Sequence, residues 1–120
     1  DGISLHAARA LDDWHSLAEA KKIGQKMDRD TKWQEVPDEW IVEFHDIFSF
    51  LDVKGFRYYI PAYMVWSIKE PKASNSNSLN SLFYAFEERD GYYQSHFEIL
   101  NQEQLDAISN FIEFVNSYIY

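Results

Sequence analysis

The sequence has 120 residues, of which 46% are hydrophobic and 18% aromatic, so we expect a single globular domain spanning 1–120 rather than a disordered chain. It contains no cysteine, which excludes a disulfide framework, a thiolate metal site and a cysteine nucleophile, and which fits a cytoplasmic location. The formal net charge is −9, and a surface of that sign repels the phosphate backbone of nucleic acids and attracts basic proteins.

Two helices are predicted in the first 30 residues. Residues 5–11 fit a short helix with Ser4 at its N-cap position. Ser16 and Glu19 have the Ser-x-x-Glu spacing of a capping box, in which each side chain accepts a hydrogen bond from the other residue's backbone N–H. We expect the second helix to run from there to Met27 and to be mostly exposed, because three lysines lie along it.

A third helix is predicted to begin at Val36-Pro37-Asp38-Glu39, because proline fits the first helical turn and carboxylates favour the positive end of the helix dipole. Just before it, Trp33 stands in a polar turn, and we expect its ring to pack this turn onto the core. After it, five apolar side chains recur at helical spacing and are expected to face the core, namely Trp40, Phe44, Ile47, Phe48 and Leu51.

The next stretch is expected to change direction and form another helix. Asp52 is suited to cap a helical turn, and Gly55 is expected to allow a sharp change of direction. Pro61 then opens or kinks a helix that runs to about Lys69. Residues 73–81, which are rich in serine and asparagine, are predicted to form a flexible loop.

A β-hairpin is predicted after this loop. Aromatic-rich runs at 82–87 and 92–99 flank Glu88-Arg89-Asp90-Gly91, and an Asp-Gly pair between such runs is typical of a hairpin turn. A helix over 82–88 is the alternative. Because a two-stranded hairpin is barely stable alone, we expect it to pack on the helices.

The clearest amphipathic helix is predicted over residues 102–118. Asn101 and Gln104 form a second capping pair at its start. We expect its apolar stripe to pack on the rest of the domain rather than in a coiled coil, and this stripe consists of Leu105, Ile108, Ile112, Val115 and Ile119. The predicted fold class is therefore α+β, mostly α, with several packed helices and one small β-hairpin.

The sequence lacks the motifs of common catalytic and metal sites. Its four histidines lie in separate segments without a His-Glu-x-x-His pair, so we expect no metal site. It has no Gly-x-Ser-x-Gly elbow and no glycine-rich phosphate loop. No apolar run approaches the roughly 20 residues of a membrane helix. We therefore expect no cofactor, no membrane span and no enzymatic activity.

The acidic residues are concentrated in the C-terminal third. Residues 73–120 contain seven acids and one base, Arg89, so this segment contributes −6 of the net charge. A field of this kind draws in a basic protein surface, although charge that only keeps the domain in solution is the simpler explanation. The residues expected to contact a partner flank the predicted turn and are Glu87, Glu88, Asp90, Tyr92 and Tyr93.

Aromatic residues are unusually dense between Trp40 and Trp66. Most are expected in the core, whereas exposed tyrosine and tryptophan are favoured at protein interfaces. Arg57 lies among them and is expected to pair with an acid such as Asp52 or to stack on a ring. A ligand pocket is the alternative, and its candidate residues are Arg57, Tyr59 and Tyr63.

The segment from Phe48 to Met64, FSFLDVKGFRYYIPAYM, resembles the central motif of a family of small bacterial proteins classed as a domain of unknown function. The shared features are a Phe-Leu-Asp segment, Gly-Phe-Arg, two aromatics and an aliphatic-Pro-Ala-Tyr. Trp33, Val36-Pro37 and the helix that begins near Asn101 are similar too, so the resemblance spans nearly the whole chain. It implies a shared fold and a bacterial origin, and it implies no reaction or ligand.

The function expected from these features is that of a protein-binding module. Small size, segregated acidity, surplus aromatics and the missing catalytic motifs favour an immunity or inhibitor protein that masks a basic toxin or enzyme through an acidic surface. One alternative is a structural or regulatory homo-oligomeric subunit. Another is a small-ligand-binding protein or enzyme that uses the Tyr/Arg-lined pocket.

Overall fold

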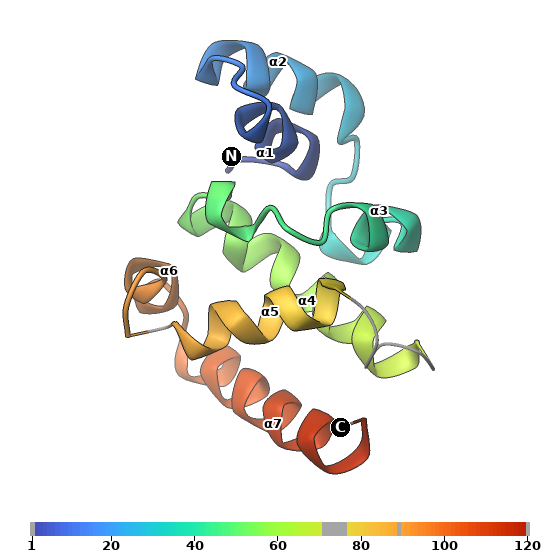
Figure 1. Ribbon diagram of the computed structural model, residues 1–120, viewed down its shortest axis with the longest axis vertical. Helices are drawn as coiled ribbons and strands as arrows, with labels where there is room; N and C mark the ends of the chain where they lie inside the picture. Colours follow the sequence, from blue (N-terminus) through green and yellow to red (C-terminus); the bar gives the residue numbers. More distant parts are fainter. Residues whose placement is uncertain (1, 71–76, 89, 120) are drawn as a thin grey trace.

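The structure, a computed structural model, describes residues 2–70, 77–88 and 90–119, and this part of the chain contains seven α-helices and no β-strand (Figure 1). In chain order the helices are α1 (Leu5–Asp12), α2 (Leu17–Met27), α3 (Asp38–Glu43), α4 (Val53–Lys69), α5 (Asn77–Glu87), α6 (Gln94–Glu98) and α7 (Gln102–Tyr118). Two 3-10 turns, η1 (Trp33–Glu35) and η2 (Phe48–Phe50), precede α3 and α4.

Helices α1 and α2 form an antiparallel pair at one end of the molecule (Figure 1). The predicted capping box is confirmed, since Glu19 N donates to Ser16 Oγ at 3.2 Å and Ser16 N donates to Glu19 Oε1 at 3.1 Å. The exposed character of α2 is confirmed too. Asp28, at the end of α2, binds the start of α1, because it accepts from His6 N at 2.9 Å and lies 2.6 Å from His6 Nδ1.

The helix predicted from Val36 ends at Glu43, much earlier than the apolar spacing indicates. Two carbonyls near its end accept side-chain hydrogen bonds from other helices. Ser78 Oγ donates to Ile41 O at 2.6 Å, and Tyr63 Oη donates to Phe44 O at 2.5 Å. The core assignment nevertheless holds for four of the five predicted residues, which are buried in the connection to α4, and Trp40 is half-buried.

Helix α4 lies at the centre of the fold and contacts α3, α5, α6 and η1. As predicted, Asp52 caps it, with Oδ1 accepting from Gly55 N at 2.8 Å and from Ile3 N at 2.9 Å. The turn predicted at Gly55 is wrong, because Gly55 lies in the first helical turn, where it allows Ile3 to approach closely. Pro61 lies inside α4, eight residues after its first residue, and does not open it.

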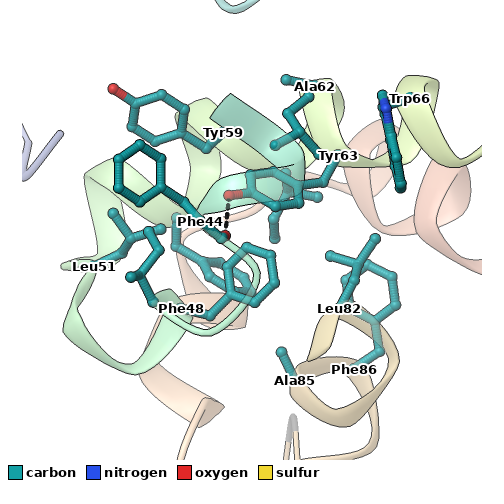
Figure 2. Close-up of a cluster of buried hydrophobic side chains, with 14 of the residues drawn as sticks. Phe44, Phe48, Leu51, Tyr59, Ala62, Tyr63, Trp66, Leu82, Ala85 and Phe86 are labelled. Carbon is teal, nitrogen blue, oxygen red and sulfur yellow. Dashed lines mark hydrogen bonds between the residues drawn. The ribbon is translucent and has the colours of Figure 1, made fainter. Parts of the chain in front are cut away.

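A single large hydrophobic cluster connects α4 with its neighbours. Figure 2 shows Tyr59, Tyr63 and Trp66 of α4 along the top of this cluster, with Phe44 and Phe48 below them on the left and Leu82 and Phe86 below them on the right. The Trp33 ring packs against the same cluster, as predicted for the turn that carries it. A smaller cluster of alanines joins α1 to α2, namely Ala7, Ala10 and Ala20.

The predicted β-hairpin, and with it the α+β fold class, is wrong. Residues 82–87 belong to α5, and residues 92–99 contain a turn and α6. Leu79, Leu82 and Phe86 are buried at spacings of three and four, whereas Tyr84 on the other face is 57% exposed. A strand would place Tyr84 with Leu82 and Phe86 on alternate positions of one face. No described glycine has a positive φ, so the turn lacks the conformation of the favoured hairpin.

The loop predicted for the serine- and asparagine-rich segment is wrong where the structure describes it, whereas the predicted last helix is confirmed. Residues 77–81 form the first turns of α5 instead of a loop, and residues 73–76 lie outside the described part of the chain. The last helix has the predicted bounds, and its capping pair is confirmed, with Gln104 N donating to Asn101 Oδ1 at 2.8 Å. Among the described residues, no helix is long and apolar enough to cross a membrane.

We expect Gly55→Ala to destabilise the protein, although alanine normally stabilises a helix relative to glycine. A Cβ atom at this position would clash with the backbone oxygen of Ile3, a residue whose N–H donates to Asp52 Oδ1 and which is therefore held in place. Overpacking of this kind typically costs about 1–3 kcal/mol. Urea unfolding measures the change. Gly91→Ala is the matched control, because its Cβ would meet the end of the Glu88 side chain at 3.0 Å and the Glu88 backbone oxygen at an ordinary contact distance of 3.7 Å.

Candidate functional site

The C-terminal helices carry an excess of carboxylates. No lysine or arginine stands among the described residues from 77 onward, while seven aspartates and glutamates do. His96 in this region is buried, and its Nε2 lies 3.0 Å from Leu51 O. Within the described part of the chain, no cationic side chain from α5, α6 or α7 therefore stands beside the carboxylates near α5.

A groove of about 650 Å³ runs between α5 and α7. One stripe of α5 forms its first wall, because Asn80, Phe83, Tyr84 and Glu87 recur at steps of three, one and three. Ile112 and Asn116, one turn apart on α7, form the second wall, and Asp90 closes one end. The groove thus combines an exposed tyrosine ring with two carboxylates.

The aromatic rings beneath this groove are packed against one another. The Phe83 and Phe111 rings are stacked with centroids 6.2 Å apart, and the Phe86 ring meets the Phe111 ring edge-on at the same distance. Phe86 and Phe111 are buried, whereas Phe83 is half-buried. Because these contacts join α5 to α7, they hold the two walls of the groove at a fixed separation.

The structure places only part of the predicted contact set at the groove. Glu87 and Asp90 line it. Glu88 lies in the turn after α5, where its carbonyl oxygen accepts from Gly91 N at 3.0 Å and Tyr93 N at 3.1 Å. Tyr92 is 64% exposed but points elsewhere, since its hydroxyl donates to Ser49 O at 3.1 Å.

Tyr93, the fifth predicted contact residue, lies in the core. Its ring stacks on Phe56 with centroids 5.5 Å apart. Burial raises the pKa of the Tyr93 hydroxyl to about 12, with a further increase from Tyr92 and Tyr84. The hairpin prediction caused this error, because it placed Tyr92 and Tyr93 on opposite faces of a strand without deciding which face was covered.

The groove residues other than the carboxylates were not predicted from the sequence. Tyr84 is the most prominent of these, as its ring is exposed on the wall formed by α5. The signal was present in the spacing of Asn80, Phe83, Tyr84 and Glu87, which is typical of one face of a helix. Because this segment was predicted to be a loop followed by a strand, the helical spacing was not used to place these four residues on one face.

The residues predicted to form a Tyr/Arg pocket do not all line one. Arg57 and Tyr59 line a depression of about 1010 Å³ between α2 and α4. Tyr63 lies in the core instead, and Figure 2 shows its hydroxyl directed at the backbone oxygen of Phe44. Burial raises the pKa values of Tyr59 and Tyr63 well above the ordinary range.

Arg57 is exposed, and with the described residues it makes neither the predicted ion pair nor a cation–π contact. Asp52, its expected partner, is occupied by the backbone N–H groups of Ile3 and Gly55. Tyr58 in the same depression donates to Asp30 Oδ2 at 2.6 Å, and burial raises the pKa of Tyr58. Among the described residues, no group of three or more His, Cys, Asp or Glu side chains is placed to hold a metal ion.

Comparison with protein families gives one match. The family described as "Family of unknown function (DUF6714)" matches residues 1–119. The chain belongs to this family. Its membership confirms the resemblance carried by the segment from Phe48 to Met64, and the family description adds no reaction or ligand. No curated protein and no solved structure matches the chain.

We expect the stability of the fold to decrease above pH 10. Tyrosine in an unfolded chain titrates near pH 10. Burial keeps Tyr59, Tyr63 and Tyr93 protonated to higher pH in the folded chain, so the unfolded state loses these protons first. Their contribution is fully present below pH 10 and decreases as the pH rises, by up to about 1.4 kcal/mol per pH unit for each residue.

Urea unfolding followed by circular dichroism from about pH 8 to pH 11.5 measures this slope. Tyr93→Phe should make the decrease above pH 10 shallower, because phenylalanine has no proton to lose. Tyr92→Phe is the matched control on the neighbouring exposed ring. An equal slope in wild type and Tyr93→Phe would contradict the assignment of Tyr93.

Proposed function

We propose that the chain is a protein-binding module that holds a basic partner in the groove between α5 and α7. The observation that supports this most is the composition of the groove, where the exposed Tyr84 ring lies beside Glu87 and Asp90. An aromatic face and carboxylates together suit an arginine or lysine side chain, since the ring stacks on the cation and the carboxylates neutralise it.

The charge of the surrounding helices supports the same partner chemistry. A basic protein that approaches this end of the molecule meets a negative field, which raises the rate of encounter and disfavours acidic competitors. We propose further that the partner is a toxin or enzyme and that the chain acts as its immunity or inhibitor protein. A cytoplasmic location belongs to this proposal and fits a chain without cysteine.

The test begins with affinity capture of a basic partner, followed by calorimetry with that purified partner. Glu87→Gln/Asp90→Asn should weaken binding by roughly tenfold or more, because both substitutions remove charge from the groove without changing side-chain size. Tyr84→Ala should have an effect of similar size through the lost ring contact. Added salt should weaken the wild-type complex.

Glu98→Gln/Glu103→Gln is the matched control, because it removes the same charge from two exposed residues outside the groove. This control should retain binding to within about threefold, since only the long-range field changes. Equal losses in both double variants would contradict a groove-specific contact and leave only a general effect of net charge. Unchanged binding in Glu87→Gln/Asp90→Asn would overturn the proposed function.

A further inference from the structure

Trp14 has the conformation and exposure of a residue that is used outside its own chain. Its side chain is 95% exposed, and its φ of 70° is the only positive φ among the described residues that are not glycine. His15 N donates to Ala10 O at 3.0 Å and Trp14 N donates to Leu11 O at 3.1 Å. This is the Schellman end of a helix, and its left-handed position is normally occupied by glycine.

Tryptophan at this position therefore adds backbone strain and covers nothing within the chain. The neighbouring side chains extend the same corner. Residues 13–19 are all exposed, and Leu17, three residues after Trp14 in the sequence, is 50% exposed. Asp13 makes no ion pair among the described residues. We call Asp13, Trp14 and Leu17 the Trp14 corner, and it presents an apolar tip with a negative charge.

The depression between α2 and α4, here called the α2–α4 groove, has complementary properties. Trp33 and Tyr58 supply aromatic surface in it. Three cationic side chains line it without an ion pair among the described residues, namely Lys21, Lys54 and Arg57. Asp28 and Asp30 line the groove too, but Asp28 accepts from His6 N and Asp30 Oδ2 accepts from the Tyr58 hydroxyl. The three cations have no such partner among the described residues, so the groove suits an acidic, aromatic projection.

The Trp14 corner and the α2–α4 groove lie at opposite ends of one face of α2. Leu17 of the corner and Lys21 of the groove are exposed and four residues apart, so they share that face, and at the groove end Gly24 and Asp28 pack against α1. The helix is about 16 Å long. When two copies of α2 lie antiparallel across a twofold axis, each corner meets the groove of the other copy, as a self-complementary interface requires.

The distribution of charge favours the same arrangement. Residues 1–30 contain six acids and five bases, a net charge of −1, whereas residues 73–120 contribute −6. Figure 1 shows α1 and α2 at one end of the long axis and α7 at the other. Contact through α2 therefore brings the nearly neutral ends together and keeps the two acidic ends apart, which limits repulsion between copies.

We infer that the chain forms a twofold dimer in which the Trp14 side chain of each copy enters the α2–α4 groove of the other, with Asp13 opposite Arg57. The occupant of the groove is thus a second copy of the chain. This dimer goes beyond the proposed function, because it uses neither wall of the acidic groove between α5 and α7. Both acidic grooves stay open to a partner in the dimer.

Sedimentation equilibrium of the full chain from about 1 µM to 200 µM tests the inference, since this range covers micromolar association. The wild type should reach twice 14.2 kDa, and Trp14→Gly should stay at 14.2 kDa. Glycine suits the left-handed backbone, so Trp14→Gly is expected to unfold at the same or higher urea concentration than wild type. Tyr118→Ala, which removes a 78% exposed ring from α7, is the control and should still dimerise.

A charge exchange tests the predicted pairing. Asp13→Lys and Arg57→Glu should each weaken the dimer by roughly tenfold, and the double variant should recover most of that loss. A double variant no stronger than the single variants would overturn the pairing of the Trp14 corner with the α2–α4 groove. A monomeric wild type throughout the range, or a Trp14→Gly dimer, would overturn the inference and leave another protein as the occupant of the groove.

Discussion

The hydroxyl groups that α4 carries into the core determine where the segments around it lie. A buried hydroxyl without a partner costs about 1–3 kcal/mol, so each tyrosine ring can be buried only where a partner is present. Tyr59 Oη accepts from Leu5 N at 3.3 Å, which fixes the start of α1. Tyr63 Oη donates to Phe44 O at 2.5 Å, which fixes the end of α3. The irregular connection between α3 and α4 is thus held by side chains rather than by regular backbone pairing.

Local signals in the sequence were sufficient to predict where three helices begin. The pairs Ser16–Glu19 and Asn101–Gln104 act within four residues, as does Asp52 with Gly55, and these three caps are formed. Ser4 has the predicted N-cap position of α1, but its side chain makes no capping hydrogen bond. The end of α3 depends instead on Ser78 and Tyr63, which lie 37 and 19 residues from the carbonyls they bind. No pattern within the helix itself contains that information, so the apolar spacing predicted the core residues correctly and the helix length wrongly.

In the candidate site too, some residues could be predicted from composition, whereas others required the correct backbone conformation. Charge counting found Glu87 and Asp90, because a carboxylate is almost always exposed and the segment has hardly any bases. Choosing the aromatic residue beside them required the correct secondary structure. A strand exposes alternate residues, whereas α5 exposes Tyr84 and buries Leu82 and Phe86. Because the strand period was wrong, Tyr93, which is buried, was included among the predicted contact residues and the exposed Tyr84 was not.

Concentrating the negative charge in one third of the chain increases repulsion between carboxylates, and solubility alone does not require this concentration. The same nine excess negative charges spread over the surface would repel one another less than six of them placed in one third of the chain. This third also exposes the rings of Tyr84, Tyr92 and Tyr118, which a purely solubilising surface would replace with polar side chains. In the proposed function, the exposed rings would supply contact area and the concentrated charge would attract a basic partner. The nearly neutral end with Trp14 and the acidic end with Tyr84 are separated along a molecule 42 Å long, so contacts at one end do not obstruct the other.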